Sequence, residues 1–318
     1  MSVRSAAVEE AVALLGPRAE RERPLGPMTT YRVGGPAALY LEVAGEEDLA
    51  LIHRAVAASG VPVVVLGRGS NLLVADRGFD GLVVSLGPSF RGVVAEEGPD
   101  ARSDGAPVRV GGAASLPVAA RQTVAMGLSG FEWAVGVPGS LGGAVRMNAG
   151  GHGSDMAACL VDARLVDLRR GEDEVVVADR LALGYRCSLV RPDQVVVWGR
   201  VALHPGDRGA GESLLAEIVQ WRREHQPGGQ NAGSVFTNPP GDAAGRLVEE
   251  AGLKGHRRGS AQVSPKHANF IQADGGGSAD DVRALMKEVQ ALVAGRCGVW
   301  LEPEVRLVGF DEPDEPQP

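Results

Sequence analysis

Three short polar segments carry residues of types that could do chemistry, and each also has an ordinary interpretation. The first is Tyr185-Arg186-Cys187-Ser188, which places an arginine in a short connection between two expected strands. An arginine fork can bind a carboxylate or a phosphate, or it can pair with a carboxylate of the fold itself. The sequence leaves both interpretations of Arg186 open.

A serine and a glutamate are the other two candidates. Ser234 stands in a glycine-rich turn at residues 233–236, without the GxSxG pattern of a serine nucleophile. It is either an ordinary turn serine or a proton donor, the second only if a strong base forms beside it. Glu304 shares one face of an expected strand with Glu302 and Arg306. On spacing alone, a solvated strand face or a simple ion pair is the favoured interpretation of Glu304.

A glycine-rich run at residues 136–153 holds seven glycines and one proline. Glycine costs backbone entropy and supplies no core contacts, so we expect neither a packed helix nor an ordinary strand here. A flexible linker is the alternative, but Val137, Leu141, Val145 and Met147 call for burial. The run therefore predicts a loop whose bare backbone N–H groups approach a flat or charged ligand.

A second donor-rich loop, GRGSN at residues 67–71, follows a β-branched strand pattern. It could hold a pyrophosphate or form a simple tight turn. Neither GxGxxG nor GxxxxGK[ST] occurs in the chain, so a Rossmann-type dinucleotide fold lacks its fingerprint.

The composition is typical of a globular protein with two or three domains: 318 residues, 44% hydrophobic and 23% charged. A net charge of −8 disfavours nucleic acid as a partner. Three separated cysteines and six histidines show neither a disulfide framework nor metal-ligand spacing, so we expect no metal. No signal-peptide core or long apolar run is present, which predicts a cytoplasmic protein without a membrane contact.

Helices and strands alternate along the chain and must position these segments. We expect helices at residues 5–15 and 46–59, one opened by Ser115, one at 212–226, and a long one capped by Ser278 and Asp281. Strands are expected at residues 39–44, 62–67, 82–86, 108–110, 160–168, 174–178, 194–203, 266–272 and 298–310. A domain boundary is expected in a loop at residues 205–211.

Seven motifs in a fixed order extend over nearly the whole chain, from about residue 29 to 310: TYRVGGPA, GRGSNLLV, VGVPGSLGGAVRMNAGGHG, YRCS, NAGSVFTNP, KHANFI and LEPEVRLVGF. Together they closely resemble the UDP-N-acetylenolpyruvoylglucosamine reductase family, in its shorter type that lacks an extra tyrosine-bearing loop.

The resemblance implies an α+β fold. Two α+β subdomains at residues 1–88 and 89–208 would form an FAD-binding fold of the vanillyl-alcohol-oxidase-like type. Residues 209–310 would form an α+β substrate domain, and the acidic, proline-rich residues 311–318 a disordered tail.

The resemblance also implies a non-covalent FAD site, with NADPH as the hydride donor. The residues expected to hold FAD come from the two glycine-rich segments: Gly67, Arg68, Gly69, Ser70, Asn71, Gly136, Pro138, Gly139, Ser140, Gly142, Gly143 and Asn148. Those expected to bind the sugar nucleotide are Tyr185, Arg222, Asn238, Lys266 and His267. Thr237 stands where the family often has a lysine, which leaves the diphosphate contacts open to Lys266, Arg222 or Arg257.

By the same resemblance, hydride would pass to the terminal carbon of an enolpyruvyl ether, and negative charge would develop on the adjacent carbon and its carboxylate. Arg186 would stabilise that charge, Glu304 would assist from the other side, and Ser234 would deliver the proton. The expected partners are the sugar nucleotide and NADPH, with a monomer as the expected state.

Two rival functions belong to other classes. An FAD oxidase that uses oxygen would often present a histidine or cysteine for covalent flavin attachment, and His152 lies within the glycine run. A non-catalytic nucleotide-binding protein could have kept the loops alone. The presence of Ser234, Arg186 and Glu304 disfavours both.

Overall fold

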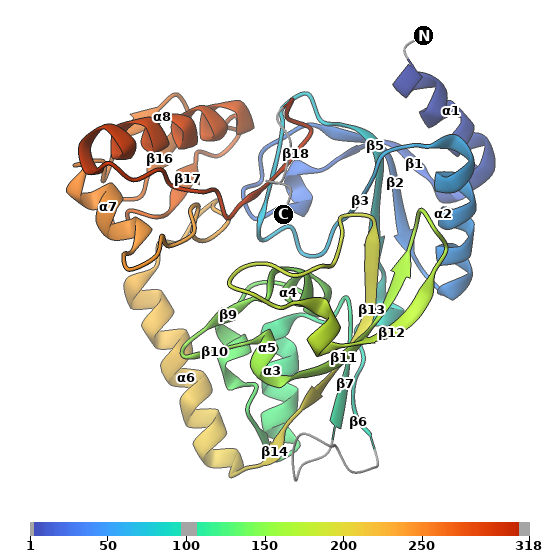
Figure 1. The fold of residues 1–318 in the computed structure, drawn as a ribbon, viewed down its shortest axis with the longest axis horizontal. Coiled ribbons are helices and arrows are strands. Elements are labelled where there is room, and N and C mark those ends of the chain that lie inside the picture. The colour runs from blue at the N-terminus through green and yellow to red at the C-terminus, as the bar shows by residue number, and fades with distance from the viewer. Residues whose placement is uncertain (1–2, 97–106, 312–318) are drawn as a thin grey trace. The chain divides into compact units, whose positions relative to one another are not determined.

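The computed structural model describes residues 3–96 and 107–311 (Figure 1). The chain forms two compact units, each made of separate segments of the sequence. The first unit comprises the chain up to Glu20, Leu39–Arg68 and Gly81–Arg222. The second comprises Arg21–Ala38, Gly69–Asp80 and the chain from Arg223 onward. The predicted boundaries near residues 88 and 208 stay predictions, and most of the acidic tail lies outside the described residues.

The first unit contains a five-stranded antiparallel sheet in the order β12-β11-β13-β7-β6. Its strands are β6 (Val93–Ala95), β7 (Pro107–Gly111), β11 (Leu160–Asp167), β12 (Asp173–Val177) and β13 (Gln194–Ala202). Two helices pack with it in one hydrophobic core, α3 (Leu116–Ala125) and α4 (Leu141–Met147). The expected strands at 160–168, 174–178 and 194–203 are confirmed.

Helix α4 contradicts the expectation that the glycine run contains no packed helix. Ser140 caps it by accepting a hydrogen bond from the Gly143 N–H at 3.4 Å. Leu141, Ala144 and Val145 are buried at helical spacing. Each interior glycine costs about 1 kcal/mol against alanine, and the burial of this apolar face offsets that cost.

Glycine is also what allows α4 to lie so close to the sheet. The Gly142 N–H donates to the Gly112 carbonyl at 2.9 Å. A Cβ at Gly142 would lie 3.2 Å from that same oxygen and 3.4 Å from the Val196 carbonyl. The glycines that lower helix propensity therefore permit a backbone-to-backbone contact that a larger residue would obstruct.

A second sheet has the order β1-β2-β5-β3, with β3 parallel to β5. Its strands are β1 (Glu20–Pro24), β2 (Pro36–Val43), β3 (Val63–Val65) and β5 (Phe79–Leu86). Helices α1 (Val3–Leu15) and α2 (Glu46–Ser59) lie beside it (Figure 1). The expected helix at 46–59 is confirmed at both ends. It stops at Ser59 because Gly60 takes the left-handed conformation.

The second unit is built on the antiparallel sheet β15-β16-β17, the helices α7 (Ala244–Glu250) and α8 (Ala279–Cys297), and one parallel pair. The three strands of the sheet are β15 (Arg257–Arg258), β16 (Ala261–Val263) and β17 (Ile271–Ala273). The parallel pair joins β4 (Leu72–Val74) to β18 (Arg306–Val308). These elements share a second hydrophobic core.

The remaining described elements are short, apart from one long helix. They are the strand pairs β8 (Leu128–Ser129) with β14 (His204–Pro205) and β9 (Gly150–Gly151) with β10 (Ser154–Asp155), the helix α5 (Met156–Cys159), and 3-10 turns at Gly16–Arg18, Gly26–Met28, Pro88–Phe90, Glu132–Gly136 and Ala178–Leu181. The long helix is α6 (Arg208–His225). No helix within residues 3–96 and 107–311 combines the length and apolarity needed to cross a bilayer.

Three predicted boundaries are wrong. Helix α6 begins at Arg208, within the loop expected at residues 205–211, rather than at residue 212, because Asp207 accepts the Ala210 N–H at 2.7 Å and caps it. The expected strand at 266–272 is a turn that reaches strand pairing only at Ile271. In the expected strand at 298–310 only Arg306–Val308 is paired as a strand, although Leu301, Val305 and Leu307, on the face opposite Glu302, Glu304 and Arg306, are buried.

Helix α8 is capped both from its own sequence and from a distant loop. Ser278 accepts the Asp281 N–H at 3.1 Å, as predicted, whereas the Asp281 carboxylate bonds Ser260 instead of closing the capping box. Asp76, next to β4, accepts the N–H groups of Ala279 and Asp280 at 2.9 and 3.1 Å. One carboxylate thereby ties α8 to the segment that carries β4.

We expect Asp76→Ala to lower the free energy of unfolding by about 1 kcal/mol, because two helix N–H groups lose their acceptor. Asp280→Ala is the matched control, since it removes a carboxylate from the same helix end and should cost only about 0.5 kcal/mol. Urea unfolding monitored by circular dichroism measures both. Equal losses in the two variants would show that Asp76 acts through charge alone.

Candidate active site

The start of the GRGSN loop meets the glycine run in the first unit. A Cβ at Gly67 would lie 2.6 Å from the Ser140 hydroxyl oxygen, so the GRGSN loop and the start of α4 are in contact. Gly67, Pro138 and Gly143 are exposed around the buried Ser140. This surface presents main chain with almost no side chain, which fits a flat, charged group such as a flavin dinucleotide.

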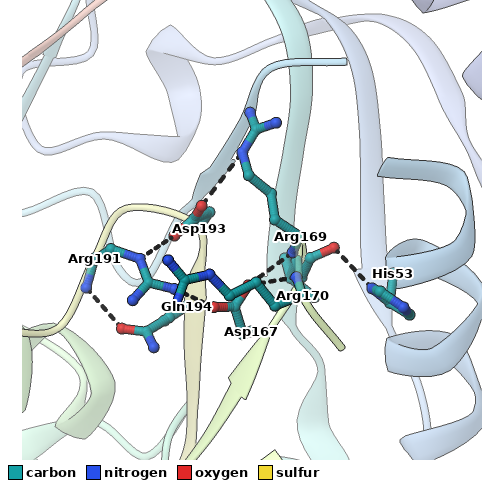
Figure 2. Close-up of polar contacts among 8 residues, drawn as sticks. His53, Asp167, Arg169, Arg170, Arg191, Asp193 and Gln194 are labelled. Atoms are coloured by element: carbon teal, nitrogen blue, oxygen red, sulfur yellow. Dashed lines mark hydrogen bonds and ion pairs between the residues drawn. The ribbon is translucent and has the colours of Figure 1, made fainter. Parts of the chain in front are cut away.

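A buried carboxylate supports the first of these loops. Asp167, at the end of β11, accepts the backbone N–H groups of Arg169 and Arg170 at 2.9 and 2.8 Å (Figure 2). Arg191 pairs with Asp167 and also with Asp193, which fixes the turn before β13.

The carbonyl of the next residue, Pro192, accepts the Val65 N–H at 3.3 Å. Val65 is the last residue of β3, and only Leu66 separates it from the GRGSN loop. The cluster in Figure 2 therefore anchors the strand end from which that loop departs.

Asn148, predicted as a cofactor contact, has its side-chain amide engaged with protein. Its amide nitrogen donates to the Gly184 carbonyl at 2.9 Å and to Asp155 at 3.2 Å, while its oxygen accepts the Ala157 N–H at 2.9 Å. A contact from Asn148 to a cofactor would thus use the main chain. The side chain connects the end of α4 to the segment that carries Arg186.

Arg186 lies in a tight turn closed by the pair Gly184 and Cys187. Its φ of 58° is in the left-handed region, which costs a non-glycine residue about 1 kcal/mol. The guanidinium donates to the Gly150 carbonyl at 3.2 Å and stacks 5.3 Å from the Tyr185 ring centre. The structure thus places Arg186 against the glycine run, in a conformation that its surroundings must hold.

Ser234 and Glu304 come together in the second unit. The Glu304 N–H donates to the carbonyl of Val235, the residue after Ser234, at 2.8 Å. The Glu304 carbonyl in turn accepts from the Asn71 side chain at 3.0 Å. Asn71, another predicted cofactor contact, therefore uses its amide donor to position the Glu304 backbone.

Gly69 shows why the GRGSN loop requires glycine. Its φ is 61°, and a Cβ there would lie 2.3 Å from the Met28 carbonyl. The Gly69 carbonyl accepts the Thr30 N–H at 3.0 Å, which fixes the path of the loop toward Ser70 and Asn71. The roles predicted for Arg68, which is exposed, and for Ser70 stay predictions.

Several predicted substrate residues have protein partners in the structure. Lys266 donates to the Arg223 carbonyl at 2.6 Å, and the Asn238 side chain accepts the Ala244 N–H at 3.0 Å at the start of α7. Nδ1 of His267 accepts the Asn269 N–H at 3.2 Å, and burial holds the pKa of this histidine below its usual value. The ring is therefore neutral near pH 7, as an accepting Nδ1 requires.

Arg222 and Tyr185 differ from that group. Burial lowers the pKa of Arg222, whose guanidinium is partly removed from water near the end of α6. Tyr185 is largely exposed beside Arg186. A partly buried cation and an exposed ring are both suited to a sugar nucleotide, and their substrate roles stay predictions.

No group of three or more histidine, cysteine, aspartate or glutamate side chains that could hold a metal ion occurs among the described residues.

Comparison with known proteins matches two parts of the chain to domain families. Residues 37–175 match an FAD-binding domain, and residues 225–308 match the C-terminal domain of UDP-N-acetylenolpyruvoylglucosamine reductase. The chain is 43% identical over 296 residues to UDP-N-acetylenolpyruvoylglucosamine reductase 2 of Symbiobacterium thermophilum, covering 92% of this chain and 93% of that one. The chain belongs to the UDP-N-acetylenolpyruvoylglucosamine reductase family.

Two further relatives agree with this assignment. The reductase of Heliobacterium modesticaldum is 44% identical over 294 residues, which cover 91% of this chain and 90% of that one. The crystal structure of the Thermus caldophilus reductase has a TM-score of 0.76 and 35% identity, over 92% of this chain and 99% of that one. The predicted family and the FAD-binding plus substrate-domain fold are confirmed.

The predicted site residues fall in different matched domains. The FAD-binding domain contains all twelve predicted FAD residues, and the C-terminal domain contains Ser234 and Glu304. Arg186 lies between the two matched segments and belongs to the first unit. Family membership sets aside the oxygen-using oxidase, and His152 packs its ring edge-on against Trp221, 5.1 Å between centres.

We expect Gly67→Ala to weaken FAD binding at least about tenfold, because the added methyl group displaces Ser140 from its position beside the loop. Gly92→Ala is the control, since a Cβ there meets no atom within 4 Å. FAD affinity is measured by flavin fluorescence on titration of the apoprotein. A Gly67→Ala protein that binds FAD like the control would contradict the assignment of this loop.

Proposed function

We propose that this chain reduces the enolpyruvyl ether of UDP-N-acetylglucosamine-enolpyruvate to UDP-N-acetylmuramate, a step in peptidoglycan precursor synthesis. FAD, when bound, supplies a hydride that it has taken from NADPH. The protein's task is then to hold the substrate, to stabilise the charge left by hydride addition and to deliver one proton.

Arg186 is proposed to stabilise the developing negative charge. Hydride addition to the terminal carbon of the double bond leaves charge on the adjacent carbon and the carboxylate attached to it. A guanidinium fixed in advance lowers the energy of that charge without reorganising during the reaction. The left-handed turn, the contact to Gly150 and the stacking on Tyr185 support this role, since each restricts where the guanidinium lies.

Ser234 is proposed to donate the proton to the carbon adjacent to the carboxylate. A serine hydroxyl is a weak acid, but the acceptor carbon is strongly basic and the transfer takes place within one complex. Glu304 is proposed to assist at the substrate carboxylate through a shared proton. The observation that carries the proposal is the 2.8 Å bond from the Glu304 N–H to the Val235 carbonyl, which holds the two residues on adjoining segments.

The finer statements about the surroundings are proposals too. We infer that the chain acts as a monomer in the cytoplasm, where the sugar nucleotide and NADPH are found. Tyr185, Arg222, Asn238, Lys266 and His267 are proposed to contact the sugar nucleotide.

NADPH consumption by the FAD-loaded protein, followed at 340 nm with and without the enolpyruvyl sugar nucleotide, tests the function. We expect consumption only when the sugar nucleotide is present. Consumption that is independent of the sugar nucleotide and requires oxygen would point to the oxidase instead. No consumption in either case would overturn the proposal.

Ser234→Ala separates proton delivery from the rest of the reaction. We expect flavin reduction by NADPH to stay near normal, while flavin reoxidation by the sugar nucleotide slows by about 1,000-fold, within the range that general acids contribute. Anaerobic stopped-flow spectroscopy measures each half-reaction separately. Equal slowing of both half-reactions would contradict a role as proton donor.

A further inference from the structure

We propose that Asn269 is a positioning residue for the reaction, because its amide and backbone fix the two residues that follow Ser234. This inference rests on the proposed function, in which Ser234 and Glu304 act on the substrate. Asn269 lies in the KHANFI segment, at the end of a turn that leads into β17, and only 4% of its surface is exposed.

The side chain of Asn269 bonds both backbone groups of Phe236, an arrangement called the clamp below. Its oxygen accepts the Phe236 N–H at 3.0 Å, and its amide nitrogen donates to the Phe236 carbonyl at 2.8 Å. One donor and one acceptor are needed at once, and a side-chain amide supplies them from two separate atoms. An aspartate in the same place would set an acceptor against the Phe236 carbonyl.

The main chain of Asn269 extends the clamp by one residue. Its carbonyl accepts the Val235 N–H at 2.8 Å. The Val235 carbonyl, on the other side of the same residue, accepts the Glu304 N–H at 2.8 Å. Three hydrogen bonds from Asn269 therefore hold a short backbone segment that has Ser234 at one end and Glu304 bonded to its middle.

The residues before Ser234 form a local turn, so the backbone position of Ser234 is fixed mainly by the residues that follow it. Gly233 has a φ of 79°, and its N–H is held by the Asn231 side chain at 3.0 Å in a local turn. Val235 and Phe236 are fully buried, whereas Ser234 is only half-buried. The position of the Ser234 hydroxyl therefore depends on the buried segment after it, and Asn269 fixes that segment.

The Asn269 turn is itself held by buried groups. The Ser264 hydroxyl, which has no exposed surface, accepts the N–H groups of Lys266 and His267 at 3.2 and 3.4 Å. Nδ1 of His267 then accepts the Asn269 N–H. Every main-chain or side-chain bond in this series lies within the second unit.

Two variants of the FAD-loaded enzyme test the inference. Asn269→Ala removes both side-chain bonds, and Asn269→Asp keeps the size and the acceptor but loses the donor to Phe236. In both we expect reoxidation of the flavin by the sugar nucleotide to slow by about 100-fold, the effect of misplacing a reacting group by about 1 Å. Flavin reduction by NADPH should be unchanged.

A control variant separates positioning from general loss of stability. Val282→Ala truncates a fully buried side chain of α8, in the same unit, that makes none of the hydrogen bonds of the clamp. It should lower the urea midpoint and leave both half-reactions as in the wild type. Slowing of reoxidation in Val282→Ala to the level of Asn269→Ala would overturn the inference.

The double variant Ser234→Ala/Asn269→Ala provides the decisive measurement. If Asn269 acts by placing Ser234, its removal should add little once the hydroxyl is gone, so the two losses should be far from additive. Additive losses, equal slowing of both half-reactions, or a wild-type rate in Asn269→Asp would each overturn the inference. A wild-type enzyme that the sugar nucleotide fails to reoxidise would instead overturn the proposed function, and the inference with it.

Discussion

The close approach of a glycine-bearing helix to the five-stranded sheet is the contact on which much of the first unit depends. The Leu141 and Gly142 N–H groups donate to the Ala114 and Gly112 carbonyls at 3.0 and 2.9 Å, which joins α4 to the end of β7 through main chain alone. Ser140 caps this helix and Asn148 ends it. Ser140, at the start of α4, lies beside Gly67 of the GRGSN loop. Asn148, at its end, donates to the Gly184 carbonyl in the turn that carries Arg186.

Around the proposed catalytic serine, the second unit is held by hydrogen bonds that involve side-chain amides and irregular backbone. Extended segments around Val235, Glu304 and Asn71 are bonded to one another, and amides supply the connections. Buried peptide groups need partners, and irregular chain cannot supply them through regular pairing. Asparagine side chains do so here, which explains why amide-bearing motifs cluster around the proposed catalytic serine.

Local pattern predicted much of the fold, because periodicity and caps act over a few residues. The helix at 46–59 and four strands of the five-stranded sheet, β7, β11, β12 and β13, follow directly from such patterns, whereas β6 has no counterpart among the expected strands. The helix within the glycine run does not follow from local pattern: helix propensity disfavours it, and the burial of Leu141 and Val145 offsets that cost. The clamp on Phe236 joins residues 33 positions apart, and no local pattern indicates which of several asparagines makes it. Individual roles for the site residues came from the family resemblance, since Ser234, Arg186 and Glu304 each had an ordinary interpretation of equal or greater weight.

The parallel pairing of β4 with β18 has a consequence for how the chain folds during synthesis. Asn71 and Glu304, which flank this pair, are 233 residues apart. On a ribosome, β4 emerges long before its partner strand, so the second unit cannot complete its core until residues 306–308 have been synthesised. The buried residue Leu73 must meanwhile remain unpaired or be shielded. A chain that stalls before β18 has been made would thus expose this apolar strand.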